Sequence, residues 1–155
     1  MANPTHRFTD KVVVVTGAGG GIGTAIAERF ASEGAQVVVT DSNAELAEAT
    51  TAGITAAGDR AATIVADISD PSECARLIAE TVERYGRIDV LCNNAGINRR
   101  GPLLELTPDD WHATMRVNVD AMFYLCREAI PHMIEQGGGA IVNLSLIHIS
   151  EPTRL

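Results

Sequence analysis

Gly17, Gly21 and Gly23 have the spacing of a turn that can hold a phosphate group. A glycine has no Cβ atom, so it permits a tight turn, a close approach of the backbone to a ligand, and close packing of a helix on a strand. Behind this turn, apolar residues recur at helical spacing from Ile22 onward. The start of a helix presents free N–H groups and the positive end of the helix dipole. The pattern therefore predicts a pyrophosphate site.

Asp41 is a further residue whose position predicts a role in ligand binding. It follows the strand-like run 36–40 and comes about 20 residues after the glycines, where a dinucleotide-binding fold places the acid that holds the adenosine ribose. A carboxylate and a ribose 2′-phosphate about 4 Å apart repel by up to about 4 kcal/mol at an effective dielectric constant of about 20. No basic residue stands at Gly19, at Gly20 or directly after Asp41. NAD is therefore expected to bind better than NADP.

The glycine-rich turn has other interpretations. Taken alone, it could be a flexible connection between a strand and a helix, because the motif by itself is weak. A phosphate-loop NTPase is disfavoured, since no Gly-Lys-Ser or Gly-Lys-Thr follows the turn.

The elements that position these residues alternate between strand and helix. Four consecutive valines at 12–15 are typical of a central strand that is buried on both faces. A long helix follows Thr107, and Pro131 is expected to kink it or mark a joint. Five repeats of this alternation predict an α/β fold, with a parallel sheet covered by helices on both faces. The predicted strands are 12–15, 36–40, 63–67, 88–92 and 140–144. The predicted apolar stripe of the first helix consists of Ile22, Ala25, Ile26 and Phe30.

Composition restricts the class of partner. The chain has 155 residues, the length of one domain, and a formal net charge of −8, which disfavours nucleic acid and anionic membrane surfaces. Its three cysteines, Cys74, Cys92 and Cys126, are far apart, so we expect reduced thiols and no metal site. No signal peptide or membrane span is evident, and we expect a soluble, cytoplasmic protein.

Further candidates follow the fourth predicted strand. The run Asn93-Asn94-Ala95-Gly96 would lie at the carboxyl end of that strand, where ligands bind in an open α/β sheet. A plain turn is the alternative, because Asn and Gly favour turns. Arg99 and Arg100 could contact a substrate or could simply be solvated surface residues.

Together these residues resemble the classical type of the short-chain dehydrogenase/reductase family. The resemblance extends from Phe8 to Asn143. Its motifs are Thr16-Gly17-x-x-x-Gly21-x-Gly23, Asp67 after the third strand, Asn93-Asn94-Ala95-Gly96 after the fourth, and Asn118 inside the long helix. The family implies a Rossmann-type doubly wound sheet of strand order 3-2-1-4-5. It also implies hydride transfer between a nicotinamide cofactor, NAD or NADP, and a small alcohol or carbonyl substrate.

The resemblance also implies roles for individual residues. The glycine turn would contact the pyrophosphate through Gly17, Gly21, Ile22 and Gly23. Asp67 and Ile68 would meet the adenine, while Asn94, Ala95 and Gly96 would line the path to the nicotinamide. Asn118 would match the active-site Asn, which kinks the helix and holds a water in a proton relay, although a helical Asn can also bond locally. The full-length form is expected to be a homo-oligomer.

The sequence departs from the family after the fifth strand. Catalysis in the family uses a Ser, a Tyr and a Lys beside the Asn, but no Tyr-x-x-x-Lys is present here. Of the two positions where the family usually carries small or hydroxyl residues, the second being catalytic, Ser145 fills the first and Leu146 the second. Ser145 is therefore the catalytic candidate as a shifted substitute. We expect no turnover from these residues alone.

The last residues suggest a domain boundary. Residues 144–154 resemble the translation of a sequencing-library adapter, so we expect 1–143 to be an incomplete NAD(P)-binding Rossmann domain and 144–155 to be a non-native tail. A non-catalytic dinucleotide-binding module that senses redox state is the alternative function. An unstable, inactive fragment is a third possibility, because an unpaired fifth strand and a partly uncovered long helix favour aggregation.

Overall fold

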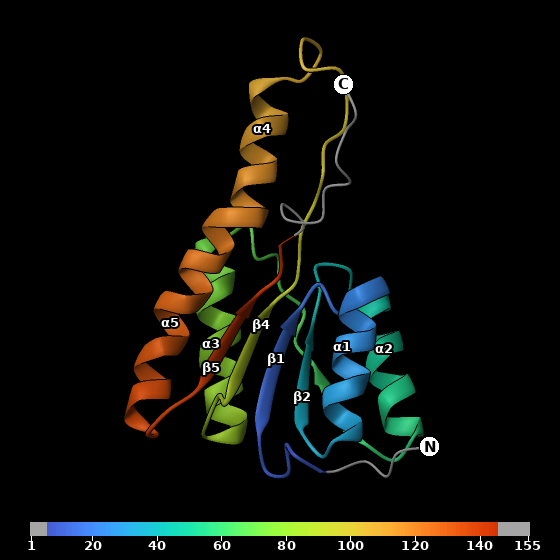
Figure 1. Cartoon of the computed structure of the whole chain (residues 1–155), viewed down its shortest axis with the longest axis vertical. Coiled ribbons are helices and arrows are strands. Elements are labelled where there is room, and N and C mark those ends of the chain that lie inside the picture. The colour runs from blue at the N-terminus through green and yellow to red at the C-terminus, as the bar shows by residue number, and fades with distance from the viewer. Residues whose placement is uncertain (1–5, 146–155) are drawn as a thin grey trace, which may run out of the picture.

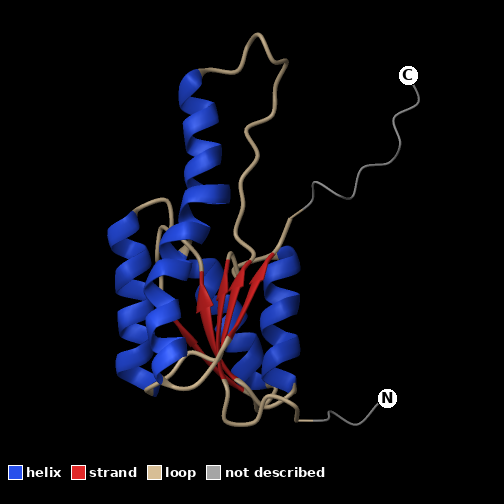
Figure 2. Cartoon of the chain, turned by 60° about the vertical axis from the view of Figure 1, so that its left-hand side comes forward, coloured by secondary structure: helices blue, strands red, loops and turns tan. Residues whose placement is uncertain are grey.

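The computed structural model, which describes residues 6–145, is built around a five-stranded parallel sheet with helices on both faces (Figures 1 and 2). The sheet has the order β3-β2-β1-β4-β5, which confirms the predicted fold class and strand order. The strands are β1 (Val12–Thr16), β2 (Gln36–Thr40), β3 (Arg60–Thr63), β4 (Val90–Asn93) and β5 (Ala140–Asn143). The helices are α1 (Gly21–Ser32), α2 (Ala44–Ala56), α3 (Pro71–Tyr85), α4 (Pro108–Met115), the π-helical turn η1 (Arg116–Asp120) and α5 (Ala121–Glu135). Apart from Leu144 and Ser145, the predicted tail lies outside the described residues.

The four valines of β1 divide between the two faces of the sheet. Side chains of a strand alternate in direction. Val12 and Val14 therefore join the core beneath α3 and α5, whereas Val13 and Val15 join the core beneath α1 and α2. All five residues of β1 are buried, and β1 pairs in parallel with both β2 and β4. This strand is the centre from which the functional site is built.

The predicted apolar stripe of α1 is correct only in part, because Ile26 and Phe30 pack against the core whereas Ile22 and Ala25 are exposed. Ile22 is 58% exposed, and the buried residues of the helix are Gly23, Ala27 and Ala31. The helix lies so close to the sheet that only small residues fit between them. Backbone proximity, rather than the size of apolar side chains, therefore decides which face of α1 is buried.

The third strand lies earlier than its predicted range of 63–67, since β3 ends at Thr63. Beyond β3, the N–H groups of Ile64 and Ala66 still donate to the carbonyls of Val39 and Asp41, each at 3.1 Å. The predicted run thus continues along β2 without forming a regular ladder. β4 is likewise displaced by one or two residues from its predicted range.

The long helix is interrupted at η1 and not at Pro131. α5 continues through Pro131, whereas η1 separates α4 from α5 and contains Asn118. A π-helical turn inserts an extra residue into the helix and is common at functional sites. Pro131 therefore marks no joint between helices, and the alternative prediction of a kink there stays a prediction. Within residues 6–145, no helix combines the length and the apolar character needed to cross a lipid bilayer.

Candidate nucleotide-binding site

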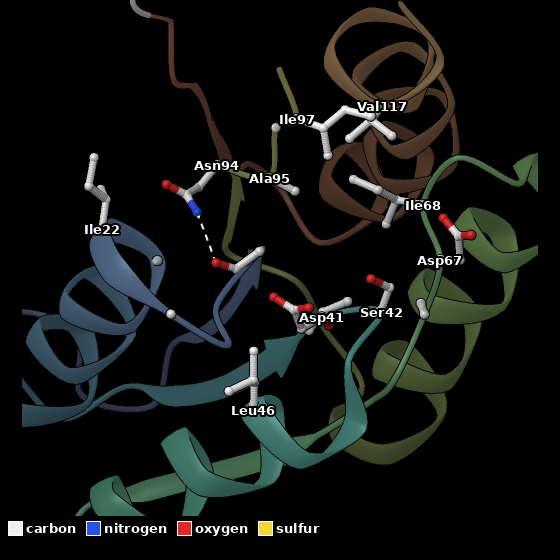
Figure 3. Close-up of a pocket in the computed structure, with 16 residues that line it drawn as sticks. Ile22, Asp41, Ser42, Leu46, Asp67, Ile68, Asn94, Ala95, Ile97 and Val117 are labelled. Atoms are coloured by element: carbon white, nitrogen blue, oxygen red, sulfur yellow. Dashed lines mark hydrogen bonds between the residues drawn. The ribbon is translucent and has the colours of Figure 1, made fainter. Parts of the chain in front are cut away.

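A cavity of about 440 Å³ opens at the carboxyl ends of β1, β2 and β4 (Figure 3). Four chain segments converge on it: the glycine turn, the end of β2, the segment after β3 and the segment after β4. Its lining residues are Gly17, Gly20, Ile22, Gly23, Thr40, Asp41, Ser42, Leu46, Ala66, Asp67, Ile68, Asn94, Ala95, Gly96, Ile97 and Val117. Among the described residues, no cluster of His, Cys, Asp and Glu side chains could hold a metal ion.

Two glycines of the turn are required by close contacts. A Cβ atom at Gly23 would lie 2.0 Å from the carbonyl oxygen of Gly17, so α1 could not approach β1 if residue 23 had a side chain. Gly17 has a φ of +62°, and a Cβ atom there would lie 2.7 Å from Cα of Ala95. Gly21 also has a positive φ, but it does not line the cavity. The turn is therefore shaped by backbone packing.

The N-terminus of α1 is free to meet an anion. Its N-cap residue, Gly20, provides no side-chain hydrogen bond, and the first turn contains no acidic residue. The first N–H groups of an α-helix have no partner within the helix. Since Gly20, Ile22 and Gly23 all line the cavity, this helix end faces the space that a ligand would occupy.

The segment after β4 is attached to the glycine turn by a set of hydrogen bonds. The Asn94 amide nitrogen donates to the carbonyl oxygen of Thr16 at 2.9 Å and to that of Gly17 at 3.2 Å. Figure 3 draws the second of these hydrogen bonds as a dashed line. The backbone N–H groups of Asn94 and Ala95 donate to the Thr16 hydroxyl, each at 3.2 Å. The glycine turn and the segment after β4, which form two walls of the cavity, are thus fixed relative to each other.

Asp41 is fixed at the end of β2, with its carboxylate bordering the cavity (Figure 3). One carboxylate oxygen accepts from the N–H of Gly19 at 3.1 Å, and the other from the N–H of Asn43 at 3.0 Å. A Cβ atom at Gly19 would lie 2.9 Å from the carboxylate. A side chain at position 19 would therefore displace Asp41, so the glycine is needed for the acid to stay at the cavity.

The predicted adenine contacts lie on the wall formed after β3. Figure 3 shows Asp67 and Ile68 beside the chain that leads to α3. The Asp67 carboxylate accepts from the N–H of Ser69 at 3.0 Å, which fixes this turn. Ile68 is buried and gives the wall an apolar surface. The wall can therefore offer both an apolar face and a carboxylate to a ligand.

The two predicted catalytic residues do not line the cavity. Both ends of the Asn118 amide bond to the backbone of Ile97, accepting from its N–H and donating to its C=O, each at 2.9 Å. Asn118 therefore holds the segment after β4 in place, next to Val117, which does line the cavity. Ser145 is exposed and lies two residues beyond β5. The described residues do not bring Ser145 into the cavity.

Several lining residues were not predicted as site residues. They belong to the same four segments, to α2 and to η1, and most flank predicted residues. They are Gly20, Thr40, Ser42, Leu46, Ala66, Ile97 and Val117. Thr40 and Ser42 stand on either side of Asp41, and Ile97 follows Gly96, so proximity in sequence was an available signal. Val117 and Leu46 come from helices, and only the fold brings them to the cavity.

The three cysteines supply no nucleophile. All are free thiols, as predicted, and Cys74 and Cys92 are buried. Burial raises the pKa of Cys74 to about 11 and raises the pKa values of Cys92 and Cys126 as well. Since the thiolate is the reactive form, these thiols are unsuited to covalent catalysis at neutral pH.

Comparisons with known proteins agree with this geometry. The sequence profile of the family described as short chain dehydrogenase matches residues 11–152. An uncharacterized oxidoreductase of Thermotoga maritima is 43% identical over 139 residues, covering 90% of this chain and 55% of that protein. The D-threitol dehydrogenase of Mycolicibacterium smegmatis is 40% identical over 141 residues, covering 90% and 54%. The chain thus spans about half the length of these curated relatives.

A solved structure shares the arrangement of the elements. The crystal structure of a metagenomic short-chain oxidoreductase in complex with NADP superposes with a TM-score of 0.89 at 38% sequence identity. The superposition covers 94% of this chain and 66% of the other. That relative therefore shows the same fold with a dinucleotide bound, and the cofactor in its crystal is NADP.

Proposed function

The chain belongs to the short-chain dehydrogenase/reductase family, and we propose that it is the NAD-binding portion of an oxidoreductase. The proposed enzyme transfers a hydride between the nicotinamide and an alcohol or carbonyl substrate. The cavity at the carboxyl ends of β1, β2 and β4 supports dinucleotide binding, because such cavities hold ligands in open α/β sheets. D-threitol dehydrogenase is among the relatives, which supports an alcohol substrate.

The position of Asp41 is the observation that carries the preference for NAD. The carboxylate is held at the cavity by two backbone N–H groups and is not paired with any Lys or Arg within residues 6–145. It can therefore accept hydrogen bonds from the 2′- and 3′-hydroxyls of a ribose. A 2′-phosphate would meet the repulsion of up to about 4 kcal/mol expected at about 4 Å and a dielectric constant of about 20.

The remaining residues are assigned by their places around the cavity. Gly17, Gly23 and the start of α1 would bind the pyrophosphate, with Ile22 beside it and Gly21 shaping the turn. Asp67 and Ile68 would hold the adenine. Asn94, Ala95 and Gly96 would line the path of the nicotinamide, which supplies the hydride when it is bound. Asn118 would act at the reaction end by fixing Ile97, and Ser145 stays a catalytic proposal.

A pair of fluorescence titrations with NADH and NADPH tests this proposal. We expect NADH to bind at least about tenfold more tightly than NADPH, because about 1.4 kcal/mol of the repulsion is enough for that ratio. Asp41→Asn should reduce the ratio of NADH affinity to NADPH affinity, because it should weaken the binding of NADH and strengthen the binding of NADPH. Glu48→Gln removes one exposed negative charge that does not line the cavity, and it should leave the ratio of the two affinities unchanged.

The outcomes separate two claims. Equal or tighter binding of NADPH to the unaltered chain would overturn the NAD preference but not dinucleotide binding. Failure of both cofactors to bind a folded chain would overturn the proposed function as a whole.

A further inference from the structure

The starts of α1 and α2 differ in how they would receive an anion. The N-terminus of α1 has no side-chain cap and no acidic residue in its first turn. At the start of α2, by contrast, the Asn43 side chain accepts from the N–H of Leu46 at 3.1 Å, and Glu45 adds a negative charge to the first turn. A cap uses a free N–H group, and an acid offsets the positive end of the helix dipole. The start of α2, which follows Asp41 in the chain, is therefore unfavourable for a phosphate group.

Leu46 and Asp41 lie side by side at the glycine turn. A Cβ atom at Gly19 would lie 2.8 Å from Cβ of Leu46 and 2.9 Å from a carboxylate oxygen of Asp41, so both side chains border the same point next to Gly19. Figure 3 shows the side chain of Leu46 extending from α2 towards Asp41. Leu46 is 49% exposed and lines the nucleotide cavity. An apolar side chain therefore forms the wall of the cavity next to the carboxylate.

The neighbouring lining residues supply no positive charge either. Between positions 40 and 46, the residues that line the cavity are Thr40, Asp41, Ser42 and Leu46. The proposed function places the ribose hydroxyls at Asp41, so a phosphate on the 2′-hydroxyl would lie next to these residues. Proteins hold phosphate groups with guanidinium or ammonium groups and with free backbone N–H groups. The N–H groups of Gly19 and Leu46 are already bonded to Asp41 and Asn43, so this wall would leave the charge of a 2′-phosphate uncompensated.

We infer that Leu46 is a second residue that determines cofactor specificity, because it keeps an uncharged surface at the place where a 2′-phosphate requires a cation. This inference rests on the proposed function, which places the adenosine ribose at Asp41. The two residues act differently: Asp41 repels a phosphate, whereas Leu46 withholds the positive charge that would bind it. Removing the charge of Asp41 should therefore not be sufficient for a preference for NADPH, and a cation at position 46 should supply what is missing.

Fluorescence titrations of the full chain with NADH and NADPH provide the test. Leu46→Arg is made together with Asp41→Asn, so that the new guanidinium cannot pair with the carboxylate of Asp41. Relative to Asp41→Asn alone, the double variant should bind NADPH at least about tenfold more tightly, because a guanidinium group and a phosphate form a charge-assisted pair. NADH has no phosphate at this place, so its affinity should change by less than about threefold. Leu46→Lys in the same background is a second test variant and should also tighten NADPH binding.

Two matched controls separate a charge at the cavity from other effects of the substitution. Ala52→Arg, also combined with Asp41→Asn, adds the same charge to an exposed position of α2 that does not line the cavity. It should change the affinity for NADPH by less than about twofold. Leu46→Met in the same background changes the shape of the side chain without adding charge, and it should not tighten NADPH binding. Urea denaturation checks that each variant is folded, which we expect because Leu46 is half-exposed.

Three results would overturn the inference: an affinity for NADPH that neither cation at position 46 increases, an equal increase from Ala52→Arg, or a preference of Asp41→Asn alone for NADPH. A parallel NADH titration of the unaltered chain keeps the two claims apart. Binding of NADH to the unaltered chain together with any of these results contradicts only the inference, whereas a folded, unaltered chain that does not bind NADH contradicts the proposed function.

Discussion

The two strands β1 and β5 belong to one sheet but differ in how completely they are buried. Every residue of β1 is buried, whereas in β5 Ile141 is half-buried and its neighbours are exposed. The helices differ in the same way. α1 lies against the sheet through Gly23, Ala27 and Ala31, while α5 leaves Phe123 61% and Ile134 73% exposed.

This difference separates the two ends of the proposed site. The glycine turn and Asp41 stand on β1 and β2, where packing on both faces fixes the backbone. Ser145 follows β5, whose residues are mostly exposed to solvent. We therefore expect nucleotide binding to depend on the buried strands β1 and β2 and to be measurable independently of catalysis.

The largest expected effect is that of Gly23→Ala. The added Cβ atom would lie 2.0 Å from a backbone oxygen, so α1 must move away from β1. We expect the free energy of unfolding to fall by about 3 kcal/mol or more, and NADH binding to be lost with it. Urea denaturation and NADH fluorescence measure the two effects.

Gly53→Ala is the matched control for that substitution. Gly53 lies inside α2, and a Cβ atom there would meet no atom within 4 Å. Alanine should stabilise the helix by about 0.5–1 kcal/mol. If Gly23→Ala were as harmless as this control, the close approach of α1 to β1 would be wrong.

One substitution made in each strand tests the contrast between them. Val14→Thr in β1 buries a hydroxyl without a partner and should cost about 1–3 kcal/mol of unfolding free energy. Val142→Thr in β5, where the side chain is 46% exposed, should cost less than about 0.5 kcal/mol. Urea denaturation of both variants gives the comparison directly. Equal costs would show that β5 is covered as completely as β1.

A pH-dependent effect concerns the ion pairs of Glu33. Glu33, at the end of α1, bonds to Arg7 and Arg29. The hydrogen bond from Arg7, followed by the nearby positive charges of Arg29 and Arg7, lowers the pKa of Glu33 from its ordinary 4.5 to about 2, against the opposing effect of burial. The stabilisation from this group is therefore fully present above pH 4.5 and is lost as the pH falls towards 2.

Glu33→Gln tests this dependence of stability on pH. At neutral pH the variant should be less stable than the unaltered chain, and the difference should shrink as the pH falls from 4.5 to 2. Urea denaturation over this pH range measures it, with Glu48→Gln as the control because Glu48 is exposed and forms no ion pair within residues 6–145. A difference that did not change with pH would contradict the role given to Glu33.

Local patterns in the sequence were sufficient to predict that five strands alternate with helices, whereas the strand order came from the family resemblance. Runs of valine mark β1 and β2, and α3 begins after its N-cap Asp70 with a proline and ends at a glycine, Gly86. The fully buried residues of α1, Gly23, Ala27 and Ala31, could not be predicted in this way. Its buried face is set by how near the backbone of β1 lies, and periodicity favours the largest apolar residues instead.

Site residues were predictable where they form a short motif directly after a strand. Most predicted residues line the nucleotide cavity because each follows a strand whose carboxyl end is on the same edge of the sheet. Leu46 and Val117 were not predicted as site residues because they reach the cavity from helices. The family resemblance implied a helix irregularity at Asn118, but the hydrogen bonds of Asn118 with the backbone of Ile97 could not be predicted from the sequence.

A crystal structure of the chain with NADH tests the central claim most directly. We predict the pyrophosphate at the N-terminus of α1 and the adenosine ribose hydroxyls about 2.5–3.0 Å from the Asp41 carboxylate. A ribose that does not contact Asp41, or a dinucleotide bound away from the glycine turn, would contradict the account.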